Sequence, residues 1–62
     1  MERDRKIEKV RLIEEQTSSK FEEKLNYALF SGFEITDLSK FTIEVSNNNV
    51  INYIIMVVKY EN

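Results

Sequence analysis

The side chains of this 62-residue chain that could do chemistry are carboxylates, amines, guanidinium groups and hydroxyls, because the sequence contains no histidine and no cysteine. Such a composition lacks the commonest general base, the thiolate nucleophile and the usual ligands of transition metals. Glu14 and Glu15 point to opposite sides of a strand, and Glu22 and Glu23 point about 100° apart on a helix, so neither pair makes an acid/base dyad. The single glycine, Gly32, leaves no phosphate-binding loop. We therefore expect no catalytic residue, no metal site and no cofactor.

The charge of the chain is unevenly distributed. The formal net charge is −2, which argues against sequence-independent binding of nucleic acid over the whole surface. Residues 1–11 nevertheless hold five basic and three acidic side chains, so the N-terminal end is basic within an acidic protein. This end fits contact with a phosphate or an acidic partner, or a solvated edge strand of alternating charge.

The length of the chain bounds its stability and its setting. A chain this short buries only about 60% of the surface that its unfolded form exposes, and without disulfides or a metal the usual remaining help is oligomerisation. MERDRKIEKVRLIEE alternates in charge and predicts neither a signal peptide nor an anchor, and no stretch approaches the roughly 20 apolar residues of a membrane span. We expect one domain over residues 1–62, with a loose N-terminus at 1–5, in the cytoplasm and away from membranes.

A period of about 3.6 residues in the middle of the chain predicts a helix over residues 19–31. Ser19 followed by Glu22 fits a capping box at its start, and Gly32 fits a left-handed cap at its end. Phe33, just beyond the cap, is expected to fold back toward the helix. The helix carries one apolar stripe: Phe21, Leu25, Ala28 and Leu29.

Alternating apolar residues predict strands on both sides of the helix. The first covers about residues 6–14, and the second lies within residues 34–46, where it is clearest at Phe41, Ile43 and Val45. The last strand covers residues 50–60. The first strand should place Val10 and Leu12 on one side and Ile7, Lys9, Arg11 and Ile13 on the other.

Three asparagines, residues 47–49, predict the hairpin that joins the second and last strands. A three-residue loop sets Val45 opposite Ile51 and Ile43 opposite Tyr53, whereas a two-residue loop would set Ile43 opposite Asn52. We favour the longer loop because it makes one face wholly apolar.

The order strand, helix, strand, strand predicts an α+β fold, a three-stranded sheet of order 1-3-2 with one helix on one face. The run VINYIIMVVKY is then the central strand. The helix can cover the face with these apolar residues: Phe41, Ile43, Val45, Ile51, Tyr53, Ile55 and Val57. The other face is left without cover, so we expect a homodimer or a higher symmetric oligomer. The reverse assignment of the two faces leads to the same expectation. The expected interface residues are Thr42, Val50, Ile54, Met56 and Val58.

Two aromatic residues on the predicted helix point away from its apolar stripe. Tyr27 lies about 120° and Phe30 about 180° from Phe21 around the helix. They fit contact with a second copy or a ligand, or simply lie over their own surface. Further candidate contacts with a partner or ligand are Lys9, Arg11 and Tyr60.

Three functions from different classes fit these features. The first is a non-catalytic binding protein that inhibits or scaffolds another macromolecule. The second is an oligomeric sponge that sequesters a small nucleotide-like ligand between subunits, with an aromatic ring stacking on it and a basic side chain taking its phosphate. The third is a DNA-binding regulator that uses the first strand as a ribbon, with Lys9 and Arg11 reaching bases, and the acidic balance of the chain counts against it.

The segments KVRLIEE, FEEKLNYALF, ITDLSKFTIEV and IIMVVKYE resemble, in that order, a family of very small Firmicute proteins known from a sporulation protein and also met in phages and mobile elements. The resemblance covers about residues 9–61 and rests on hydrophobic spacing and helix composition. It implies a bacterial or phage origin and a cytoplasmic setting, and it transfers no site residue. Because small phage proteins often inhibit host defence or sequester its nucleotide signals, it favours the first two functions.

Overall fold

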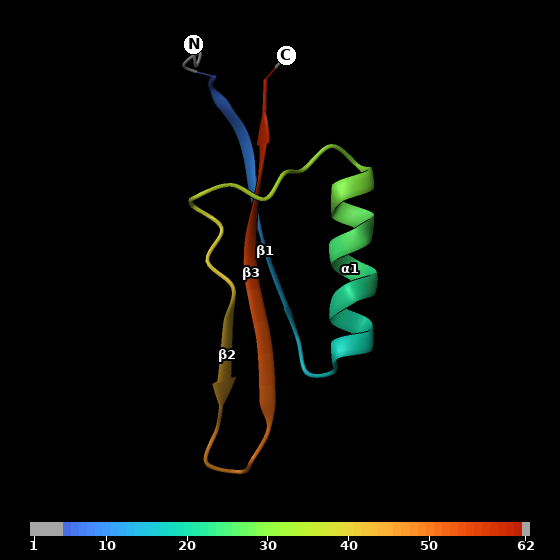
Figure 1. The fold of residues 1–62 in the computed structure, drawn as a ribbon, viewed down its shortest axis with the longest axis vertical. Coiled ribbons are helices and arrows are strands. Elements are labelled where there is room, and N and C mark those ends of the chain that lie inside the picture. Colours follow the sequence, from blue (N-terminus) through green and yellow to red (C-terminus); the bar gives the residue numbers. More distant parts are fainter. Residues whose placement is uncertain (1–4, 62) are drawn as a thin grey trace.

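The computed structural model describes residues 5–61 and contains a three-stranded sheet with one helix on one face (Figure 1). The elements follow the order β1 (Ile7–Glu15), α1 (Ser18–Phe30), β2 (Thr42–Val45) and β3 (Ile51–Tyr60). β3 lies between β1 and β2 and is antiparallel to both. The predicted α+β fold and strand order are therefore confirmed. The predicted loose N-terminus falls, apart from Arg5, outside the described residues.

The start of α1 differs from the predicted capping box. Thr17 is the N-cap: its backbone is extended, and its Oγ1 accepts a hydrogen bond of 3.2 Å from the backbone N–H of Lys20. Ser19, the predicted cap, lies inside the first turn. The prediction was wrong because several adjacent residues can cap a helix, and the one that does so is the last residue in extended backbone.

The end of α1 agrees with the prediction. Gly32 has a φ of +103°, the left-handed conformation that glycine adopts without a steric penalty. The N–H of Gly32 donates to the carbonyl of Leu29, and the N–H of Phe33 donates to the carbonyl of Ala28. This pair of bonds is a Schellman motif, and it carries Phe33 back into the core beside Ala28.

The hairpin register agrees with the three-residue loop. Val45 pairs with Ile51 and Ile43 with Tyr53. Asn49 has a φ of +62°, so one of the three asparagines does supply the left-handed residue that such a loop requires. β2 is shorter than the predicted span of 34–46, because a turn at residues 36–39 breaks it. In this turn the backbone N–H of Thr36 donates to Oγ of Ser39.

The core lies between α1 and the β1–β3 half of the sheet. Its buried side chains come from the helix, from β1 and β3 and from the residue after the cap: Ile13, Phe21, Ala28, Phe33, Ile55 and Val57. Leu25 and Tyr53 pack against this cluster. At the hairpin side the ring of Phe21 lies 5.6 Å from that of Phe41 and 5.9 Å from that of Tyr53. The prediction that the helix covers the face of Tyr53, Ile55 and Val57 is thus correct.

The helix covers only part of that face. The hairpin projects beyond the N-terminal end of α1 (Figure 1), and Ile43, Val45 and Ile51 remain exposed there. The molecule measures 45 × 19 × 17 Å and its radius of gyration is 13.3 Å. A compact chain of this length has a radius of gyration of about 10.5 Å. The expectation that the helix would shield the whole apolar face of the hairpin was therefore wrong.

A β-bulge in β1 changes which side Ile7 faces. Ile7 pairs with Tyr60 but Lys9 pairs with Lys59, so Glu8 is an extra residue in β1. The bulge shifts the alternation by one residue, and Ile7 joins the side of Val10 and Leu12. The prediction had placed Ile7 on the opposite side, with Lys9.

The observed cap can be tested against the predicted one with two matched substitutions. Thr17→Ala removes the acceptor for the Lys20 N–H and should lower the free energy of unfolding by about 1 kcal/mol. Ser19→Ala changes a residue inside the helix and should change stability by less than about 0.5 kcal/mol, because alanine has the higher helix propensity. Urea denaturation of both variants measures the difference. A larger loss for Ser19→Ala would contradict the observed cap.

Candidate binding surfaces

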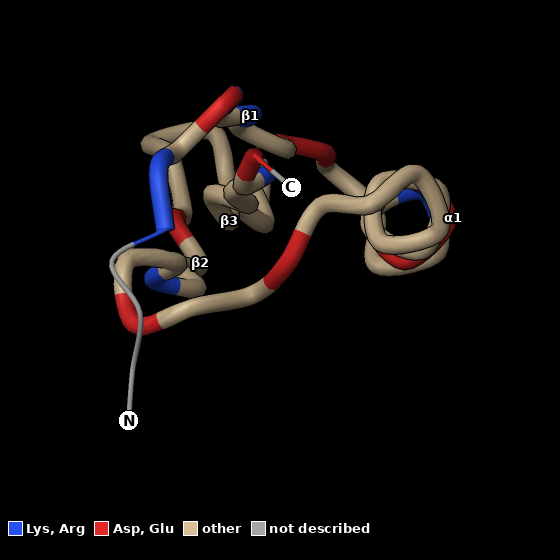
Figure 2. The backbone as a smooth tube through the Cα atoms, turned by 90° about the horizontal axis from the view of Figure 1, so that it is seen from above, with Lys and Arg blue, Asp and Glu red and all other residues tan. Residues whose placement is uncertain are grey.

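Within residues 5–61, the face of the sheet opposite α1 carries no helix. Viewed from above, α1 lies to one side of the three strands and no helix lies on the other side (Figure 2). The register brings together on this open face the apolar pairs Leu12–Met56 and Val10–Val58, and it places Glu14 and Thr42 on either side of Ile54. We call this surface, Val10, Leu12, Thr42, Ile54 and Met56, the open face.

The predicted interface residues occupy different depths. Thr42 is exposed, and Val50, Ile54 and Met56 are half-buried. Val58 is fully buried, with 0% of its surface exposed, so it offers nothing to a second chain. The physical reason is its position between Val10 of β1 and Glu34, whose backbone N–H and carbonyl both hydrogen-bond to Val58.

Sequence reasoning left Val10 and Leu12 out of the interface. They are the most exposed apolar side chains of β1: Leu12 retains 63% of its surface. The signal was available in the alternation of β1, because an antiparallel β1–β3 pairing must set its apolar side beside that of β3. What was lacking was the register that places Leu12 opposite Met56.

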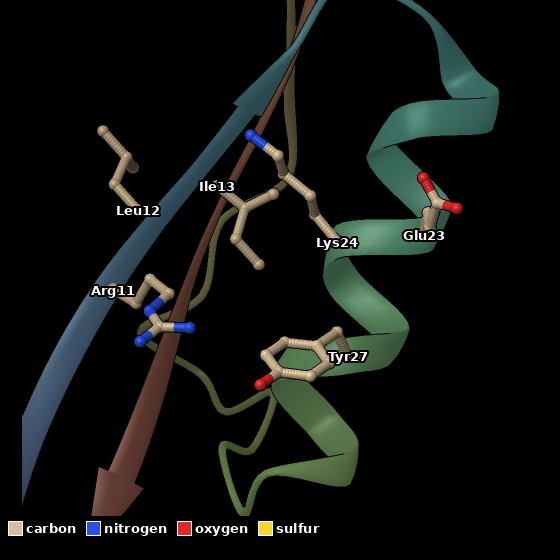
Figure 3. A pocket seen from close by; sticks show the side chains of 6 residues that line it. All are labelled: Arg11, Leu12, Ile13, Glu23, Lys24 and Tyr27. Atoms are coloured by element: carbon tan, nitrogen blue, oxygen red, sulfur yellow. The ribbon is translucent and has the colours of Figure 1, made fainter.

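A groove of about 470 Å³ lies between β1 and α1 (Figure 3). Its lining comes from one strand and one helix: Arg11, Leu12, Ile13, Glu23, Lys24 and Tyr27. Ile13 belongs to the buried core and forms the floor. The structure thus brings together two of the predicted ligand contacts, Arg11 and Tyr27. We call this site the β1–α1 groove.

Arg11 is held in place by an aromatic ring. Its guanidinium carbon lies 4.7 Å from the centroid of the Phe33 ring, within the range of a cation–π contact. Lys59 lies over the same ring at 5.9 Å. Among residues 5–61, the ion pairs are Arg5–Glu34 and Lys24–Glu15, so Arg11 has no carboxylate partner.

Lys24 is paired with a carboxylate of β1. Its Nζ forms an ion pair with Oε2 of Glu15, at the end of β1. The hydrogen bond from Lys24 is the main reason that the pKa of Glu15 lies below its ordinary value of 4.5. This pair connects the C-terminal end of β1 to the middle of the helix.

The other predicted contacts lie elsewhere. Phe30 is 89% exposed on the helix and does not line the groove. Lys9 is exposed opposite Lys59. Tyr60 is half-buried beneath Arg5, whose guanidinium carbon lies 4.0 Å from the centre of its ring.

Among residues 5–61, no group of three or more acidic side chains lies close enough to hold a metal ion. In the same part of the chain, no helix has the length and apolarity that crossing a bilayer requires.

Comparisons with models of protein families, with curated proteins and with solved structures find no match to this chain. The resemblance to the small Firmicute and phage family therefore stays a prediction.

The Glu15–Lys24 pair makes a prediction about pH. Because the pKa of Glu15 is lowered in the folded state, the pair stabilises the fold above pH 4.5, and this contribution is lost as the pH falls through the lowered pKa. Glu15→Gln should therefore be less stable than wild type at pH 7 and equally stable well below pH 4.5. Thermal unfolding of both proteins across this range measures the difference, and Glu14→Gln, on the opposite side of β1, is the control. A difference between Glu15→Gln and wild type that does not change with pH would contradict the pair.

Proposed function

We propose that the protein acts by non-catalytic binding and that its open face binds a second copy of the chain. The observation that supports this is the 63% exposure of Leu12, directly opposite the half-buried Met56 on a sheet face without a helix. Leaving such an apolar face exposed to water is unfavourable for a monomer. Contiguous exposed apolar surface is typical of interaction sites.

The free energy gained by covering the open face is large for a chain of this size. Covering a half-exposed valine, leucine or methionine contributes about 0.5 to 1.5 kcal/mol for each side chain. The total stability of a small domain is about 5 kcal/mol at the low end of the common range. The contribution of Val10, Leu12, Ile54 and Met56 together is therefore comparable to the stability of the chain alone.

Symmetry favours a second copy as the occupant. A twofold axis through the open face would pack the open face of each copy on the open face of the other. Such an isologous arrangement is the commonest symmetry of soluble dimers.

The inhibition of a host macromolecule, which the resemblance favours, is part of the same proposal. Self-association through the open face would leave a second exposed apolar surface at the hairpin for that partner: Ile43, Val45 and Ile51. The DNA-binding alternative has less support, because Arg11 lies on the side of the sheet that α1 covers and packs on Phe33.

Two substitutions of equal starting exposure test the open face. Leu12 and Val45 are each 63% exposed, on opposite faces of the sheet. Leu12→Lys should convert the oligomer to a 7.4 kDa monomer, because it would bury an unpaired ammonium in the interface, whereas Val45→Lys should assemble as wild type does. Sedimentation velocity measures the mass, and far-UV circular dichroism confirms that both variants fold.

Either of two results would contradict the proposal. A wild-type protein that sediments as a monomer at its highest soluble concentration would show that the open face does not hold a second copy. Dissociation of the oligomer by Val45→Lys and not by Leu12→Lys would show that the interface lies at the hairpin.

A further inference from the structure

We infer that the β1–α1 groove is a binding site for a small molecule that has an aromatic ring and one anionic group, a carboxylate or a phosphate. This site goes beyond the proposed function, since of the residues that line it Leu12 alone also belongs to the open face. Three features of the groove carry the inference: its floor, its cation and its aromatic wall.

The floor and the size of the groove suit an organic molecule rather than a bare ion. Ile13, at the bottom, belongs to the apolar core. A volume of about 470 Å³ falls within the range of about 300 to 1,000 Å³ that is usual for small-molecule sites. An apolar floor of this kind can contact the flat face of an aromatic ring.

The cation of the groove is positioned before any ligand arrives. The guanidinium carbon of Arg11 lies over the Phe33 ring at 4.7 Å, and this contact limits the rotamer entropy that binding must remove. Its N–H groups have no carboxylate partner within residues 5–61, whereas Lys24 at the same groove is paired with Glu15. The guanidinium group presents a planar fork of N–H donors, which matches two oxygens of a carboxylate or a phosphate.

Glu23, the acidic residue that lines the groove, does not face an anion bound at Arg11. Glu23 comes from the same helix, but its carboxylate points away from Arg11 (Figure 3). The ligand's anionic group would therefore meet Arg11 without a facing carboxylate.

The aromatic wall is Tyr27. Its ring lies across the groove from Arg11, with the hydroxyl turned toward β1 (Figure 3). Tyr27 is 66% exposed, so its side chain is accessible for stacking. A ligand ring against Tyr27 would bring an attached anionic group toward Arg11, which explains why the ring and the anion must belong to one molecule.

The test is a titration of the ¹⁵N-labelled full chain, followed by NMR, with two probes that separate the two kinds of anion. Adenosine 5′-monophosphate carries a phosphate and 4-methoxybenzoate carries a carboxylate. We expect saturable shifts at Arg11, Ile13 and Tyr27 for at least one probe, with a dissociation constant below about 1 mM. Adenosine and inorganic phosphate, each with only half of the recognised chemistry, should bind at least about tenfold more weakly than the better probe.

Matched variants decide whether the groove itself is the site. Arg11→Gln and Tyr27→Ala should each weaken binding by about tenfold. Lys9→Gln removes a cation from the same strand, and Phe30→Ala removes a more exposed aromatic ring from the same helix, and neither residue lines the groove. These two controls should bind as wild type does.

Three outcomes would overturn the inference. The first is the absence of saturable shifts with both probes up to about 10 mM. The second is equal weakening by Arg11→Gln and Lys9→Gln, which would mean that general charge attracts the anion. The third is equal weakening by Tyr27→Ala and Phe30→Ala. The sedimentation of the wild-type protein bears on none of these readouts, so the two proposals fail separately.

Discussion

One constraint shapes the whole molecule: a single short helix must cover a sheet whose central strand is apolar on both faces. α1 has 13 residues and is about 20 Å long, whereas the 10 residues of β3 span about 33 Å. The helix therefore covers the middle of one face and leaves the hairpin end of that face bare, together with the other face. The elongated shape and the exposed apolar surfaces both follow from this shortage of helix.

The same shortage produces the β1–α1 groove. The apolar stripe of the helix, Phe21, Leu25 and Ala28, packs on the core. On the side toward β1 the helix presents Lys24 and Tyr27 instead, and these long side chains stand beside the space above Ile13 rather than filling it. A second helix over β1 would close this space, but the chain has none among its described residues. The groove is thus a consequence of how narrow the apolar stripe is.

The sequence predicts those features that depend on local chemistry. Asparagines at 47–49 fix the hairpin register, and Gly32 fixes the end of the helix, because few residues adopt a positive φ. The choice of Thr17 over Ser19 as the cap is not predictable in this way, because both residues can accept the same kind of hydrogen bond.

Features that depend on long-range geometry could not be predicted from the sequence. The bulge at Glu8 changes the facing of Ile7, and it is visible only once β1 is paired with β3. Val58 has the same side-chain alternation as Met56, yet its burial depends on the backbone of Glu34, 24 positions away in the sequence. Of the groove, the sequence predicted Arg11 and Tyr27 as separate contacts, but their meeting depends on how β1 and α1 pack.

The position of Arg11 has a second physical cause that does not involve a ligand. The last turn of α1 contains no basic residue, although a cation there is stabilised by the partial negative charge of the free carbonyl groups. The strands supply the cations instead: Lys59 lies against Gly32, just past the end of the helix, and Arg11 shares the Phe33 ring with it. Fold stability alone can therefore explain why a cation packs on Phe33. It does not explain why Tyr27 stands opposite with an exposed ring, since Tyr27 is absent from the core and its ring gains little from burial there. The contribution of Tyr27, more than that of Arg11, distinguishes a binding site from a charge that only completes the helix.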